Sequence, residues 1–191
     1  MEEKRDRRVM LTKRLLKDAL ITLMRKEPLH SISIKKICET ADVNRSTFYH
    51  HYDTQFDLYD DILSDVSDEI GQIINGAKEK DGSTLTMLTD IFQYAEDHRD
   101  LFLVILSTNS TLNLGEGFTK NVARFLDKEN ATGMAAYCTQ FIAAGVANIM
   151  WIWLNESDRR SARDVAMVMN ALLRHGFKKA ALLVGGAGFP S

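Results

Sequence analysis

The sequence predicts an all-α fold, and three observations lead to this prediction. Helix-forming residues dominate a chain of 191 residues that is 45% hydrophobic, which is enough for a well-buried core. The two prolines are Pro28 and Pro190, so about 160 residues between them contain no obligatory helix break. The period-two alternation of half-buried strands is hard to find between turn signals, so we expect no sheet.

The first third of the chain predicts three helices. Apolar residues recur at helical spacing over residues 7–26, and Pro28 lies beyond the end of this first helix. Ser33 opens a second, short helix, because its hydroxyl can accept a hydrogen bond from an orphan amide of the first turn. A tight turn is predicted at residues 42–43, and an N-capping asparagine then opens a third helix over residues 44–52.

The remaining residues predict a fourth helix followed by a helical C-terminal part. Asp53 and Thr54 cap the fourth helix, which is predicted to end near residue 74, and the polar residues 75–83 predict a hinge. Further helices are predicted over residues 84–97, 99–107, 114–128, 133–155 and 161–183. The polar, glycine-bearing residues 107–117 are expected to be mobile, and the last few residues are expected to fray.

Charge is distributed unevenly along the chain. Residues 1–52 carry 12 Lys and Arg against 7 Asp and Glu, whereas residues 53–191 carry 12 against 19. A basic N-terminal part on an acidic body indicates that one end meets a polyanion such as nucleic acid. A solvated amphipathic first helix is the alternative interpretation. The acidic run from Asp57 to Glu69 on the fourth helix is interpreted as a solvated face.

Residues 33–52 have the layout of a helix-turn-helix, with two short helices joined by a tight turn. Such a motif needs a second helix that presents polar donors to the major groove and packs its other face inward. In this chain Phe48 and Tyr52, four residues apart, can share the inward face. Ser46, Tyr49 and His50 lie on roughly the opposite face. An ordinary helical hairpin remains the alternative interpretation of this pattern.

The first turn of the third helix adds groups that suit DNA. Arg45 and Thr47 lie next to the positive end of the helix, which favours phosphate. The guanidinium of Arg45 could also fork onto guanine O6 and N7.

The stretch ISIKKICETADVNRSTFYHHYDTQFDL, residues 32–58, resembles the helix-turn-helix of the tetracycline-repressor (TetR) family. The resemblance covers about residues 8–60, with its markers at Ser33, Ile37, residues 41–43 and residues 47–52. It implies a DNA-binding domain over residues 1–53 and a helical domain for effector binding and dimerisation over residues 54–191.

The resemblance also assigns roles to individual residues. Base edges or nearby phosphates would be contacted by Lys35, Arg45, Ser46 and His50. Phosphate oxygens would be held by Thr47, Tyr49 and His51. Ser33 would cap its helix close to the DNA backbone, and Phe48 and Tyr52 would be core.

Two positions depart from the family pattern. Asp42 stands where the family usually has glycine, at a turn position that often needs a positive φ, and aspartate tolerates that conformation better than most residues. Gln55 stands where the family usually has lysine. It can still donate to phosphate, but one ion contact is lost, so we expect slightly weaker and less salt-sensitive binding.

The last two long helices predict a homodimer. Residues 133–155 and 161–183 carry more apolar surface than a monomer is expected to expose, and a four-helix bundle with a second copy would bury it. Coverage of the other helices within one subunit is the alternative, and the TetR resemblance favours the dimer. The motif at residues 151–154, Trp-Ile-Trp-Leu, is also loosely similar to a branch of the family that includes activators of dihydroxyacetone metabolism. That similarity transfers no ligand.

The TetR resemblance further implies a small-molecule effector in the C-terminal helices. Candidate lining residues are Phe92, Tyr94, His98, Phe102, Met134, Tyr137, Phe141 and Trp151. Each is more often plain core than ligand contact, and a hydrophobic or aromatic effector is the default.

The expected function is a cytoplasmic regulator of transcription that binds a palindromic site on double-stranded DNA, more often as a repressor than as an activator. The longest apolar stretch, residues 141–154, is too short to cross a bilayer. No spacing of Cys or His suits a metal, and we expect no enzyme, cofactor or catalytic residue. The rival function is a helical adaptor for protein partners, which would need no donor-rich recognition helix.

Overall fold

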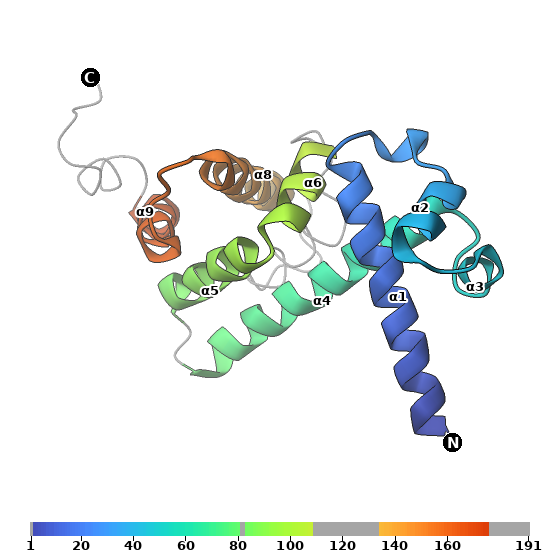
Figure 1. Ribbon diagram of the computed structural model, residues 1–191. Coiled ribbons are helices and arrows are strands. Elements are labelled where there is room, and N and C mark those ends of the chain that lie inside the picture. The colour runs from blue at the N-terminus through green and yellow to red at the C-terminus, as the bar shows by residue number, and fades with distance from the viewer. Residues whose placement is uncertain (1, 81–82, 109–133, 176–191) are drawn as a thin grey trace. The chain divides into compact units, whose positions relative to one another are not determined.

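The structure is a computed structural model that describes residues 2–80, 83–108 and 134–175 (Figure 1). These residues form eight α-helices and one short 3₁₀ helix and contain no strand, which confirms the predicted all-α fold. In chain order the elements are α1 (Glu2–Met24), η1 (Leu29–Ser31), α2 (Ile34–Ala41), α3 (Arg45–Tyr49), α4 (Gln55–Lys80), α5 (Thr84–Asp97), α6 (Arg99–Thr108), α8 (Met134–Asn155) and α9 (Ala162–His175).

The chain forms two compact units, Met1–Val66 and Ser67–Ser191. In the first unit α1 packs along α2, and α2 packs against α3. Its fully buried side chains include Leu16 and Leu20 of α1, Ile37 of α2, Phe48 of α3 and Leu58 of α4. The first unit continues past the predicted domain boundary at residue 53 and through the first three turns of α4.

The second unit is held by two helix pairs, because α5 packs along α9 and α6 packs along α8. Trp153 of α8 lies edge-on to Phe92 of α5, with ring centroids 5.5 Å apart, and its indole N–H donates to the carbonyl of Arg160 at 2.8 Å. The Nε of Arg99 donates to the carbonyl of Leu154 at 2.9 Å. The C-terminal end of α8 is therefore fixed by both apolar and polar contacts.

The structure corrects three predicted helix boundaries. α1 begins at Glu2 instead of residue 7, because the charged N-terminal residues are themselves helix formers. α4 continues to Lys80 instead of ending near residue 74, so most of the predicted hinge at residues 75–83 is helical. Buried Ala77 and helix-forming Lys and Glu residues outweigh Gly76 there. The third corrected boundary is the end of α3. The sequence predicts it at residue 52, whereas the helix ends at Tyr49.

Several predictions concern residues that the structure does not describe. The predicted helix at residues 114–128, nearly all of residues 107–117, and the chain after residue 175 lie outside the described ranges. Among the helices that are described, none combines the length and the apolarity needed to cross a membrane.

Candidate nucleic-acid interface

The turn between α2 and α3 is built by the residues that the sequence singled out. The hydroxyl of Ser33 accepts a hydrogen bond from the N–H of Lys36 at 3.3 Å, which confirms Ser33 as the N-cap of α2. Asp42 ends the helix in the left-handed conformation, with φ 53° and ψ 46°. It is the one non-glycine residue with a positive φ in the described part of the chain. Aspartate therefore fills the turn position that the family usually gives to glycine.

α3 divides its side chains between core and surface. Phe48 is fully buried and Tyr52, which follows the helix, is 6% exposed, as the i, i+4 spacing predicted. Their ring centroids lie 5.7 Å apart. Arg45, Ser46 and Tyr49 are exposed, and the tyrosine keeps 56% of its surface open to solvent. The helix thus presents a polar face outward from an aromatic anchor.

Three of the candidate DNA-binding residues come together beside the turn. Lys35, Arg45 and Ser46 line an open groove of about 620 Å³, together with Cys38, Glu39, Asp42, Val43 and Asn44. The Nζ of Lys35 lies 3.7 Å from a carboxylate oxygen of Glu39, and both side chains are mostly exposed. A phosphate could compete for this lysine at little energetic cost, because exposed ion pairs contribute little.

The other candidate residues lie within α3, directly after it, and at the start of α4. His50 caps the helix and is exposed, while His51 is half-buried, and their rings are 5.2 Å apart. Burial, then neighbouring His50 and Lys13, lower the pKa of His51, so this imidazole is neutral at neutral pH. Thr47 and Gln55 are half-buried. The structure therefore spreads the predicted DNA contacts from the turn to the residues after Tyr49.

α4 begins with a reciprocal cap that the sequence predicted in part. The N–H of Thr54 donates to the carboxylate of Asp57 at 2.8 Å, and the N–H of Asp57 donates to the hydroxyl of Thr54 at 3.2 Å. This arrangement confirms Thr54 as a cap. By contrast, Asn44 stands at the N-cap position of α3 without a side-chain capping bond.

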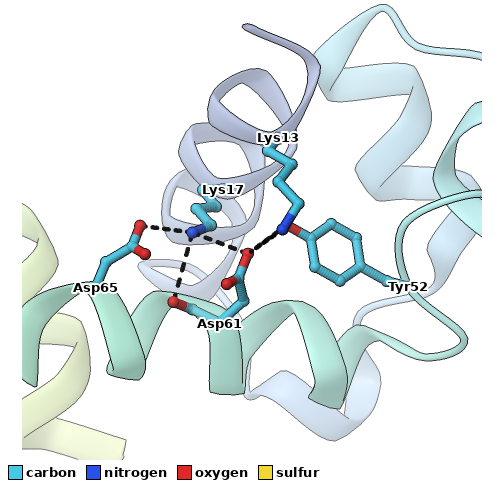
Figure 2. A network of polar contacts seen from close by, with 5 residues as sticks. All are labelled: Lys13, Lys17, Tyr52, Asp61 and Asp65. Carbon is cyan, nitrogen blue, oxygen red and sulfur yellow. Dashed lines mark hydrogen bonds and ion pairs between the residues drawn. The ribbon is translucent and has the colours of Figure 1, made fainter. Parts of the chain in front are cut away.

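A polar network that the sequence analysis missed joins α1, α4 and the residues after α3 (Figure 2). The hydroxyl of Tyr52 donates to Oδ2 of Asp61 at 2.6 Å. The ammonium groups of Lys17 and Lys13 lie 2.9 Å and 3.3 Å from the same oxygen, and Lys17 also meets Asp65 at 2.5 Å. The acidic run on α4 is therefore not a wholly solvated face. Matching i, i+4 spacing in the two lysines and the two aspartates was the available signal.

The network keeps Asp61 ionised. Burial alone would raise the pKa of this carboxyl, but the hydrogen bond from Tyr52 and the two lysines outweigh it and lower the pKa to about 2. For Tyr52, burial and then the hydrogen bond to the carboxylate raise the pKa well above its ordinary value, so its hydroxyl remains a donor. The Nζ of Lys13 also lies 5.4 Å from the centre of the Tyr52 ring, within cation–π range.

The candidate effector residues are found in two separate settings. Phe92 and Phe102 are buried, and the ring of Tyr94 lies 4.4 Å from that of His98 and 5.6 Å from that of Phe102. The other candidates lie on α8, where Tyr137, Phe141 and Trp151 are exposed by 72%, 75% and 41%. The side chain of Met134 lies outside the described residues. The structure thus brings Tyr94, His98 and Phe102 together and leaves Tyr137, Phe141 and Trp151 on the surface of α8.

In the first unit, two short helices joined by a capped turn pack on α1, and the second of them has a polar outer face, which is the layout of the helix-turn-helix class of protein. Solved structures narrow that class. The chain is similar to the TetR transcriptional regulator from Streptococcus agalactiae 2603V, with a TM-score of 0.66 and 20% identity over 91% of this chain and 99% of that one. It is also similar to a TetR-family transcriptional regulator from Streptomyces coelicolor, with a TM-score of 0.51 and 14% identity over 91% and 86% of the two chains. This chain has the TetR fold, as the resemblance at residues 32–58 implied.

A curated relative agrees with this class. The uncharacterized HTH-type transcriptional regulator YxbF of Bacillus subtilis (strain 168) is 25% identical over 97 residues, which are 48% of this chain and 26% of that protein. The chain therefore spans about a quarter of the length of that relative. No model of a protein family matches the chain. The relative and both solved structures are described as regulators of transcription, a class distinct from enzymes.

Proposed function

We propose that this protein is a homodimeric, cytoplasmic regulator of transcription that reads a palindromic DNA site with the surface of α2 and α3. The division of α3 into two faces carries the proposal. Phe48 anchors the helix in the core, while Arg45, Ser46 and Tyr49 point donors away from it. A five-residue helix gains little stability from such a surface, so a ligand that accepts hydrogen bonds explains it best.

The exposed side chains suit different parts of the DNA. Arg45 would donate to a guanine edge, with Lys35, Ser46 and His50 on neighbouring bases or phosphates. Tyr49, Thr47 and His51 would hold phosphate oxygens, which position the helix without reading sequence. Gln55, at the start of α4, would add a neutral phosphate contact.

A second copy of the chain is the proposed partner of α8. Tyr137, Phe141 and Ile152 are exposed and fall on one face of this helix, at i, i+4 and i+15. Monomers rarely leave such an apolar face in water, and a twofold mate would cover it with the same face. Two heads would then enter successive major grooves, about 34–36 Å apart, on a palindrome.

We further propose that a hydrophobic or aromatic effector binds within the second unit. The aromatic cluster of Tyr94, His98 and Phe102 supports this, because it combines aromatic rings with an imidazole and a phenol hydroxyl that can hydrogen-bond. An effector that prefers one spacing of the heads would change DNA affinity. Repression by exclusion of polymerase is the expected outcome.

The test is a selection of genomic fragments by the purified protein at two salt concentrations. We expect enrichment of a dyad-symmetric site with steep salt dependence. Arg45→Ala should change the base preference, and Arg163→Ala, which removes an exposed arginine from α9, should not. A folded, dimeric protein that enriches no site would contradict the proposal.

A helical adaptor is the second candidate, and exposed apolar residues on α1 favour it. Met10, Leu11 and Leu15 are 72%, 58% and 40% exposed. An adaptor would bind a protein through this face and would show no counterion-release slope on DNA.

A further inference from the structure

The residues that follow α3 are not held by a helix. The last helical residue is Tyr49, and the N–H groups of His51 and Tyr52 both donate to the carbonyl of Phe48 at 2.9 Å. The N–H of His50 donates to the carbonyl of Ser46 at 3.1 Å, so His50 and Tyr52 keep the helical i→i−4 spacing while His51 bonds at i→i−3. The backbone therefore closes as one irregular last turn that ends at Tyr52. The orientation of His50 and His51 therefore depends on what anchors the chain immediately after them.

That anchor is Tyr52. Its ring is buried against Phe48, and its hydroxyl donates to Asp61 at 2.6 Å. A hydrogen bond to an ionised carboxylate is stronger than one between neutral groups. Because Asp61 lies six residues after the first residue of α4, this bond joins the residues after α3 to a long, regular helix (Figure 2).

Two lysines of α1 also hold Asp61 in place. Lys13 and Lys17 of α1 both contact its Oδ2, and Lys17 also donates to its backbone carbonyl at 3.4 Å. The side chain of Asp61 is 28% exposed and that of Lys17 only 16%. A carboxylate with three donors on one oxygen has little freedom to rotate, so it can hold Tyr52 in one position.

We propose that Asp61 is a positioning residue for DNA binding. Through the hydroxyl of Tyr52 it sets the place of His50 and His51, and through Lys13 it holds a positive charge near His51. Asp61 and Tyr52 touch no DNA in this arrangement. The proposal rests on the function proposed above, because it assumes that the segment after α3 faces DNA.

The decisive variant is Tyr52→Phe, which keeps the buried ring and removes the hydroxyl. We expect the Kd for the selected site to rise about tenfold. This is the order expected when a charge-assisted hydrogen bond favours the DNA-binding conformation over the other conformations of the free protein. Tyr59→Phe is the matched control, because it removes the hydroxyl of another buried tyrosine and keeps its ring. It should leave the Kd within about twofold.

Two readouts separate positioning from loss of fold. A titration at protein concentrations far above Kd should give the same active fraction for Tyr52→Phe and for the wild type. Amide hydrogen exchange without DNA should become faster at residues 50–52 and stay unchanged in α1. When Tyr52→Phe is added to the Asp61→Asn variant, the Kd should change little further, because the two groups act as one unit.

Every outcome of these experiments supports or overturns the proposed role of Asp61. Wild-type Kd in Tyr52→Phe, a loss explained by the active fraction, or unchanged exchange at residues 50–52 would overturn the proposal. If the wild type selects no DNA, the proposed function fails instead, and exchange at residues 50–52 still decides whether Asp61 holds this segment.

Discussion

Replacing Asp61 by asparagine tests how much one ionised carboxylate stabilises the first unit. The pKa of Asp61 falls from an ordinary 3.8 to about 2. A difference of one in pKa corresponds to about 1.4 kcal/mol, so the whole difference corresponds to about 2.5 kcal/mol. The side chain keeps 28% of its exposure. Solvent screening therefore reduces the expected loss in Asp61→Asn to about 1–2 kcal/mol.

The sign of the pH dependence follows from the lowered pKa. A carboxylate whose folded-state pKa is depressed stabilises the fold above its unfolded-state pKa, and the stabilisation is lost as pH falls through the folded-state value. The difference between the wild type and Asp61→Asn should thus be constant above about pH 5 and shrink between pH 4 and pH 2. Urea unfolding of both proteins across this range measures it.

The matched control is Asp60→Asn, which removes an exposed carboxylate from the preceding position of α4. It should change the free energy of unfolding by less than about 0.5 kcal/mol. The reasoning is refuted if Asp61→Asn is as stable as the wild type at neutral pH. It is equally refuted if the stability difference stays constant down to pH 2.

Four further substitutions test the turn, the DNA face and the dimer. Tyr49→Ala should weaken binding to all sequences alike by about 1 kcal/mol, and a sequence-selective loss in a binding array would contradict its phosphate role. Arg45→Ala should relax one base pair per half-site at a cost of about 1–3 kcal/mol, so an unchanged preference in a selection would exclude base reading. Asp42→Ala should unfold in urea about 1 kcal/mol more easily than Asp42→Gly, and equal stability would show that the left-handed turn is unstrained. Phe141→Glu should shift the protein to monomer in sedimentation, and an unchanged dimer would place the interface elsewhere.

Local chemistry made the recognition motif predictable. Ser33 and Thr54 cap their helices through neighbouring amides, and Asp42 adopts its turn conformation within the same few residues. Phe48 and Tyr52 are buried because helical spacing and the following turn place both on the inner side. Such signals are carried by residues close in the chain, so pattern and propensity can reveal them.

Features that depend on distant residues were not predictable in the same way. Asp61 is 48 residues from Lys13, and the matching i, i+4 spacing of the lysines and aspartates does not by itself show that they meet. The polar segment after residue 74 looks like a break, yet Ala77 is buried and the helix continues. The aromatic residues of α8 illustrate a third limit. Their spacing identifies a face, but an apolar face can line a pocket, fill a core or meet another chain.

The brevity of α3 has a consequence for redesign. Five residues are far too few to form a helix in isolation, so a peptide copied from residues 44–52 would hold the predicted contacts and still fail to read DNA. The buried rings of Phe48 and Tyr52 hold α3 in place. The exposed polar groups of this surface come from Arg45, Ser46 and His50. Under the proposed function, substitutions at the three exposed positions would change the operator preference without refolding the first unit. The same division would let mutation change the DNA site under that function while the buried residues stay intact.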